Sequence, residues 1–97
     1  MTSPYCEFRT LTELRDFVVG TLCEQCQLQV GAFQVTQRVL MRNRRPCGIL
    51  FCLHGPRAVK VTAIWETDQN RVLFYGSTGE RLQKIQLIDA PQLEYAA

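Results

Sequence analysis

The cysteines and the single histidine are the side chains of this chain best suited to metal binding or catalysis. Cys23 and Cys26 form a C-x-x-C pair, and Cys47, Cys52 and His54 follow further along the chain. Thiolates and imidazole are preferred ligands of Zn²⁺, and four of them complete a tetrahedral site. The sequence therefore raises a secondary hypothesis, a zinc site made of Cys23, Cys26, Cys47 and His54.

The spacing of the later cysteines argues against that hypothesis. Cys47 and Cys52 lie in one apolar segment, an odd number of positions apart. On a β-strand, residues at such a spacing point to opposite faces, so these two thiols cannot both reach one metal. Cysteine is also among the residues most often buried, where it acts as a small apolar side chain. We therefore expect no metal and no other cofactor.

The cysteine count and the ends of the sequence predict a compartment. The chain has 5 cysteines, an odd number, and its first residues lack a basic start followed by an apolar block. These features favour reduced thiols and a cytoplasmic protein. No apolar run approaches the roughly 18 residues that a membrane-spanning helix requires, so we expect no membrane association.

The sequence gives little evidence of a catalytic site. The C-x-x-C pair falls at the C-terminal end of a predicted helix, where the helix dipole opposes a thiolate. Cys52 and His54 point the same way on a predicted strand, as a nucleophile and base would. However, no Asp or Asn is evident to orient His54, and the sequence has no P-loop, HExxH or GxSxG motif. We expect no enzyme activity and infer no small-molecule substrate.

The distribution of charge points to a binding partner. Residues 25–65 contain no Asp or Glu, although the whole chain carries a formal net charge of only +2. The planar guanidinium of arginine suits phosphate or carboxylate groups. The candidate residues for binding a partner or a polyanion are the cations of this segment: Arg38, Arg42, Arg44, Arg45, Arg57 and Lys60.

Two kinds of partner fit this basic segment. Phe33, Phe51 and Trp65 lie in or beside it and Tyr75 lies nearby, so bases of single-stranded nucleic acid could stack there. The sequence pI of about 8.4 is nevertheless below the value near 9 that is typical of nucleic-acid-binding domains. Nucleic-acid or other polyanion binding is therefore the alternative hypothesis, and a protein partner is the leading one.

Residues 10–23 are predicted to form a helix. Thr10 can cap its start, with Glu13 completing a capping box. The apolar residues of this segment recur at helical spacing and give the helix one face to bury. Gly20 weakens a helix, so we expect the end to fray. The predicted apolar face consists of Leu11, Leu14, Phe17, Val18 and Leu22.

In the segments that follow, apolar residues either alternate with polar ones or run without interruption, and both patterns are typical of β-strands. Connections of three to four residues join antiparallel neighbours, since a parallel crossover is much longer. A short helix from Thr36 competes with the first strand. The sequence thus predicts one α+β domain over residues 1–97, with a helix on a four- to five-stranded antiparallel meander over residues 33–88 and a tail over 89–97. The predicted strands are 33–41, 47–54, 58–66, 71–76 and 81–88.

The two faces of this sheet are expected to differ. Placing Glu66 opposite Arg71 pairs Trp65 with Val72 on the side that the helix covers. The other face keeps Ile64, Leu73 and Tyr75, together with either Leu50 and Cys52 or Ile49, Phe51 and Leu53. Residues 90–97, a curled sheet or a second subunit are the alternatives for covering it. Since Arg38, Arg42 and Lys60 share this face, the leading hypothesis is a protein-interaction module that self-associates through this mixed arginine and apolar face. Its expected partner is a second copy of the chain or another protein.

Overall fold

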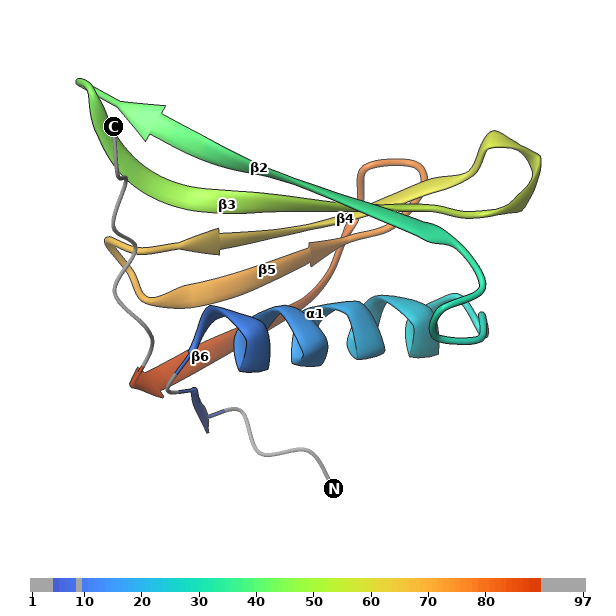
Figure 1. Cartoon of the computed structure of the whole chain (residues 1–97), viewed down its shortest axis with the longest axis horizontal. Helices are drawn as coiled ribbons and strands as arrows, with labels where there is room; N and C mark the ends of the chain where they lie inside the picture. The colour runs from blue at the N-terminus through green and yellow to red at the C-terminus, as the bar shows by residue number, and fades with distance from the viewer. Residues whose placement is uncertain (1–4, 9, 90–97) are drawn as a thin grey trace.

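A helix packs on one face of a six-stranded sheet in the computed structural model, which describes residues 5–8 and 10–89 (Figure 1). The strand order across the sheet is β1-β6-β5-β4-β3-β2, so β2 and β1 are the edge strands. Along the chain the elements are β1 (Tyr5–Glu7), α1 (Leu11–Gln25), β2 (Gln34–Arg42), β3 (Arg45–His54), a 3-10 turn (Pro56–Ala58), β4 (Lys60–Glu66), β5 (Arg71–Tyr75) and β6 (Arg81–Asp89).

The predicted α+β fold is confirmed, because strands β2 to β6 form an antiparallel meander with α1 packed against it. The prediction missed β1, which pairs in parallel with β6. Three residues are too few to show a periodicity, so no sequence signal marked this strand. Asp89, the first residue of the predicted tail, belongs instead to β6. The rest of that prediction, residues 90–97, lies outside the described residues.

The helix begins as its sequence predicts and ends two residues later. The backbone N–H of Glu13 donates to Oγ1 of Thr10 over 3.1 Å, which satisfies one of the first free donors of the helix. The helix continues through Gly20 to Gln25, so the expected early fraying is wrong. Burial of the apolar face, including Leu14, Val18 and Leu22, stabilises the helix more than one glycine weakens it.

The strand register also agrees with the sequence. Glu66 pairs with Arg71 and Trp65 with Val72, as the alternation predicted. Residues 34–42 form a strand rather than the competing helix from Thr36. Because register fixes which side chains share a face, it divides the sheet into two surfaces. We call the surface that packs against α1 the inner face, and the opposite surface the outer face.

The hydrophobic core lies between α1 and the inner face. Trp65, Phe51 and Phe74 are its largest fully buried side chains, each at most 1% exposed. Burying a large apolar side chain contributes about 1.5–3 kcal/mol. This layer therefore supplies most of the stability of a small chain. The other core residues of the sheet are Ile49, Leu53, Val61, Ala63, Val72, Ile85 and Leu87.

A two-residue turn joins β2 to β3. Asn43 and Arg44 have φ angles of 52° and 65°, which is the left-handed pair that a type I′ hairpin requires. Asparagine tolerates this conformation, whereas Arg44 adopts it at a cost of about 1 kcal/mol. The turn places Arg42 directly opposite Arg45 at the end of the hairpin.

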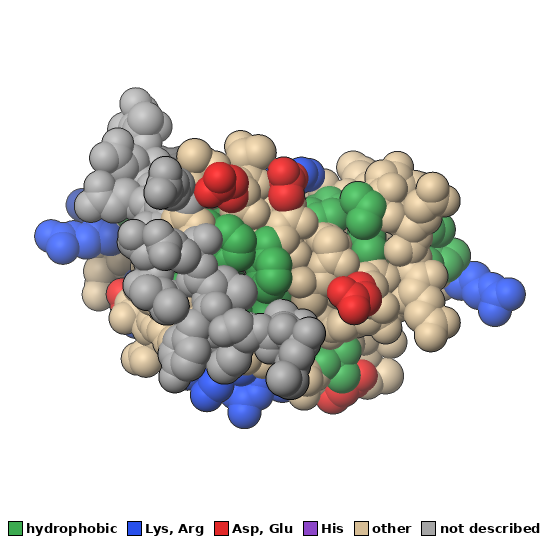
Figure 2. Space-filling view, turned by 90° about the horizontal axis from the view of Figure 1, so that it is seen from below, with side chains coloured by type: hydrophobic (Ala, Val, Ile, Leu, Met, Phe, Trp, Pro, Cys, Tyr) green, Lys and Arg blue, Asp and Glu red, His purple; other side chains and the backbone are tan. Residues whose placement is uncertain are grey.

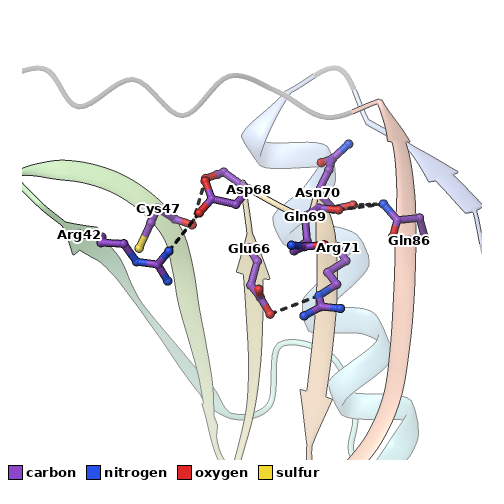
Figure 3. A network of polar contacts seen from close by, with 9 residues as sticks. Arg42, Cys47, Glu66, Asp68, Gln69, Asn70, Arg71 and Gln86 are labelled. Carbon is purple, nitrogen blue, oxygen red and sulfur yellow. Dashed lines mark hydrogen bonds and ion pairs between the residues drawn. The ribbon is translucent and has the colours of Figure 1, made fainter.

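The turn between β4 and β5 is tied to both neighbouring strands (Figure 3). On one side, the backbone N–H and the Oγ1 hydroxyl of Thr67 each donate to the carbonyl of Cys47 over 3.0 Å. On the other side, Nε2 of Gln86 donates to the carbonyls of Gln69 and Asn70, over 2.9 and 2.8 Å. These bonds fix the registers of β3 and β6 against the central hairpin. They therefore fix which side chains reach the outer face.

Candidate interaction surface

The centre of the outer face is an apolar row with a cation at each end. The sheet register places Leu50, Ile64 and Leu73 side by side across β3, β4 and β5. Arg38 of β2 adjoins Leu50 at one end of the row, and Lys84 of β6 adjoins Leu73 at the other. Leu50 and Ile64 are half-buried and Leu73 is only 5% exposed, whereas both cations are exposed. The central strand therefore places Leu50 and Cys52 outward, resolving the two alternatives left by the sequence.

A second row beside it is polar. Thr36, Cys52 and Thr62 adjoin one another across β2, β3 and β4, and Tyr75 and Arg81 continue the row across β5 and β6. Hydroxyl groups of this kind hydrogen-bond to a partner without imposing a charge. The outer face therefore combines an apolar centre, neutral hydrogen-bonding groups and peripheral cations. We call the two rows together the outer-face patch.

The outer-face patch carries an excess of positive charge. The part of the chain that the structure describes contains two ion pairs. Nε of Arg71 lies 3.4 Å from a carboxylate oxygen of Glu66, and both side chains are partly buried. Arg42 pairs with Asp68 over 3.2 Å at the exposed end of the sheet. Since neither pair uses Arg38 or Lys84, the cations at the two ends of the apolar row remain available to an anionic partner.

The six cations selected from the sequence do not form one surface. Arg42, Arg44 and Arg45 lie at the β2–β3 turn, whereas Arg57 lies in the 3-10 turn at the other end of β3. A strand of this length separates the two turns by roughly 30 Å, at about 3.3 Å per residue. Figure 2 shows Lys and Arg side chains projecting at opposite ends of the molecule, with acidic and hydrophobic side chains between them.

Only part of the predicted basic site therefore lies on the outer face. Arg38 and Lys60 belong there by register, with Lys60 paired opposite His54. Sequence reasoning missed Arg81 and Lys84, because both residues lie outside the acid-free segment of residues 25–65. The alternation within residues 81–88 was the signal that could have assigned Lys84 to the same face as Leu73.

The aromatic residues proposed to stack on bases are not available for stacking. Phe51 and Trp65 are each 1% exposed and belong to the core on the inner face. Phe33 is half-buried and packs against that core. Within strands β2 to β6, Tyr75 is the only aromatic side chain that the register assigns to the outer face. Proteins that bind single-stranded nucleic acid stack its bases on several aromatic rings, and these five strands offer one.

The cysteines and His54 are spread through the fold. Cys23 is buried in the last turn of α1, and Cys26 caps that helix. Cys47 and His54 lie near opposite ends of β3, at least 20 Å apart at about 3.3 Å per residue. Within residues 5–8 and 10–89, no group of three or more His, Cys, Asp or Glu side chains could hold a metal ion. The structure thus does not bring the four candidate zinc ligands together.

The thiol of Cys26 is poorly suited to nucleophilic chemistry. Burial raises its pKa, and repulsion from the neighbouring Cys23 raises it further. Its position at the C-terminal end of α1 acts in the same direction, because that end of the helix dipole repels a negative charge. The thiol of Cys26 therefore lacks the low pKa of a reactive cysteine.

Cys52 and His54 do share the outer face, as predicted, but their setting is polar and open. Nε2 of His54 lies 3.0 Å from Oγ1 of Thr36, an exposed contact. A hydroxyl in that position orients the imidazole without the charge that a carboxylate would supply. The contact between His54 and Thr36 therefore resembles an ordinary surface hydrogen bond more than the oriented base of a catalytic site.

Comparison of the chain with protein-family models, curated proteins and solved structures found no match. No helix in the described part of the chain is long and apolar enough to cross a membrane.

Proposed function

We propose that this protein is a non-enzymatic interaction module that binds another protein through the outer-face patch. The observation that carries the proposal is the row Arg38, Leu50, Ile64, Leu73 and Lys84, an apolar strip with an exposed cation at each end. Protein interfaces combine an apolar centre with a polar, charged rim. Complementary charge on the partner would accelerate association and fix its orientation.

The partner that fits this patch presents apolar side chains flanked by Asp or Glu. Guanidinium groups such as that of Arg38 bind carboxylates in a bidentate geometry. A symmetric dimer formed through the same patch would instead bring Arg38 and Lys84 of both copies to one interface. Like charges at an interface are costly, so we propose a different protein as the partner. Self-association stays a prediction, which sedimentation velocity of the free protein would test.

A displayed library of small helical scaffolds with randomised surfaces provides a defined probe for this proposal. Selection against the wild-type chain should enrich scaffolds that carry both acidic and apolar residues. Binding of an enriched scaffold should fall by about tenfold or more in Lys84→Glu, because each tenfold change corresponds to about 1.4 kcal/mol. Enriched scaffolds that bind Lys84→Glu as tightly as wild type would contradict the proposal.

Nucleic-acid binding is tested in parallel with a labelled single-stranded oligonucleotide at about 50 mM and 200 mM salt. We expect weak binding at both concentrations, because strands β2 to β6 place a single aromatic residue on the outer face. Tight binding that falls steeply with salt would instead support the alternative hypothesis and overturn the protein-partner assignment.

We also infer a cytoplasmic location, which the free thiols of Cys23, Cys26, Cys47 and Cys52 support. Labelling of thiols in intact cells, followed by mass spectrometry, would test it. Recovery of Cys23 and Cys26 as a disulfide would contradict this location.

A further inference from the structure

Strand β2 is a long edge strand with one side open. It lies at the end of the sheet, and its residues Gln34–Arg42 pair with β3 alone among the described strands. An edge strand presents unpaired backbone N–H and C=O groups, which are a template for another strand. The opposite edge, β1, is only three residues long. Among the described strands, β2 is therefore the better template.

A groove runs beside this edge, between β2 and α1. Its volume is about 250 Å³, and the charged residues Arg15 and Asp16 lie on its helix side. Its apolar lining comes from Val19 of α1, from Val30 and Phe33 in the connection before β2, and from Val35 of β2; Val30 is 62% exposed. The complete lining is Arg15, Asp16, Val19, Val30, Gly31, Phe33 and Val35.

The side chain of Arg15 lines both this groove and a second hollow. Nε of Arg15 donates to Oε1 of Gln37 over 3.1 Å, linking α1 to β2. The second hollow has a volume of about 110 Å³ and reaches Leu11, Ile49 and Phe51. The two recesses, each with apolar lining residues, thus share Arg15.

A strand added beside β2 would contact both the free backbone groups of this edge and the groove. Side chains of a strand alternate between the two faces, so every second residue of a strand paired with β2 would point toward the groove. The intervening residues would lie beside Arg38, which β2 presents on the outer face. Strand addition of this kind takes its affinity from backbone hydrogen bonds and its specificity from pockets for alternate side chains.

The charges of β2 indicate what the added strand carries. The segment Gln34–Arg42 contains Arg38 and Arg42 and no Asp or Glu. Antiparallel pairing of β2 with β2 of a second copy, centred on Arg38, would place the two Arg38 side chains together on the outer face, and like charges on neighbouring strands are destabilising. An acidic residue in the same position would instead pair with Arg38. The charge pattern therefore favours a strand from a different protein.

We propose that the β2 edge and the α1–β2 groove together bind an extended segment of another protein as an added strand. Its alternating apolar residues lie in the groove, and its acidic residues lie beside Arg38. This site differs from the central row of the outer-face patch. The two sites share only Arg38.

Amide hydrogen exchange with a selected peptide tests the proposal. A displayed library of random peptides of about ten residues, the upper end of usual strand length, is selected against the wild-type chain. The selected peptide is made synthetically, and its sequence should alternate apolar with acidic residues. Its binding should slow hydrogen exchange of the backbone amides of β2. Replacing Val30 and Val35 by Ser should weaken its binding by about tenfold or more, since two apolar contacts are lost.

Matched variants separate this site from the outer-face patch. Val59→Ser removes another exposed valine, 39% exposed and outside the groove, and should leave peptide affinity within about twofold of wild type. Lys84→Glu, on β6, should also leave peptide binding intact even where it abolishes scaffold binding. A peptide that leaves β2 exchange unchanged would overturn the proposal. So would a free protein that sediments as a dimer with β2 already protected, because the second copy would then occupy the edge.

Discussion

The inner and outer faces are built from the same strands but have different environments. In β4, Ala63 and Trp65 point inward and are at most 1% exposed, whereas Thr62 and Ile64 point outward and are half-buried. The inner face is matched to α1, and the outer face has no covering element among the described ones. Burial against α1 explains the apolar residues of the inner face, whereas we propose that the half-buried Leu50 and Ile64 of the outer face serve binding.

The largest difference between the faces should appear in stability. Phe74→Ala should lower the free energy of unfolding by about 3–5 kcal/mol, because it opens a cavity in the core. Ile64→Ala, one strand away on the outer face, should cost roughly 1 kcal/mol, because its side chain is only half-buried. Urea unfolding of both variants measures the contrast. Equal losses would show that the outer face is as closely packed as the core.

Replacing each of two glycines by alanine should change the stability of the protein in opposite directions. A Cβ at Gly48 would collide with the backbone carbonyl oxygen of Trp65, so Gly48→Ala should destabilise the protein by about 1–3 kcal/mol. A Cβ at Gly20 would meet no heavy atom within 4 Å. Gly20→Ala should therefore stabilise α1 by about 0.5–1 kcal/mol. Thermal unfolding would reveal both signs, and destabilisation by Gly20→Ala would contradict the open position of that residue.

The cap of α1 should make a smaller contribution. Thr10→Ala removes the acceptor for the N–H of Glu13 and should cost about 1 kcal/mol. Thr12→Ala, exposed within the first turn, is the matched control. It should change stability by at most a few tenths of a kcal/mol in the stabilising direction, since Ala favours helix. Similar losses in both variants would mean that the cap does not hold the start of the helix.

The smallest expected effect concerns Cys26. Because its pKa is raised in the folded state, the unfolded chain loses this proton first as pH rises. The contribution of Cys26 to stability is therefore fully present below the ordinary thiol pKa and is lost as pH rises through the folded pKa. Alkylation followed by peptide mass spectrometry should show Cys26 reacting more slowly than a free peptide thiol near pH 8. Faster reaction would contradict the raised pKa.

The fold was predictable where apolar residues recur at a regular spacing along the sequence. The alternation of residues 58–66 and the Glu66–Arg71 pairing fixed the central hairpin and its inner face. The Thr10 cap fixed the start of α1. By contrast, the three residues of β1 show no period, and their parallel pairing with β6 depends on tertiary contacts.

The candidate site was harder to predict. Sequence proximity grouped Arg44 and Arg57 with Arg38, although turns at opposite ends of β3 hold them apart. Lys84 lies far from that segment in sequence, yet the pairing of β5 with β6 brings it to the apolar row. Charge along a chain identifies a basic segment, but only strand order decides which cations share a face.

The most direct test of the central claim compares two equal charge reversals, one in the outer-face patch and one outside it. Arg38→Glu changes an exposed cation beside Leu50, and Arg57→Glu changes an exposed cation in the 3-10 turn. The affinity of a selected acidic scaffold is measured for each. Binding through the patch predicts a loss of about tenfold or more for Arg38→Glu and less than about twofold for Arg57→Glu. Equal losses, or a larger loss for Arg57→Glu, would contradict it.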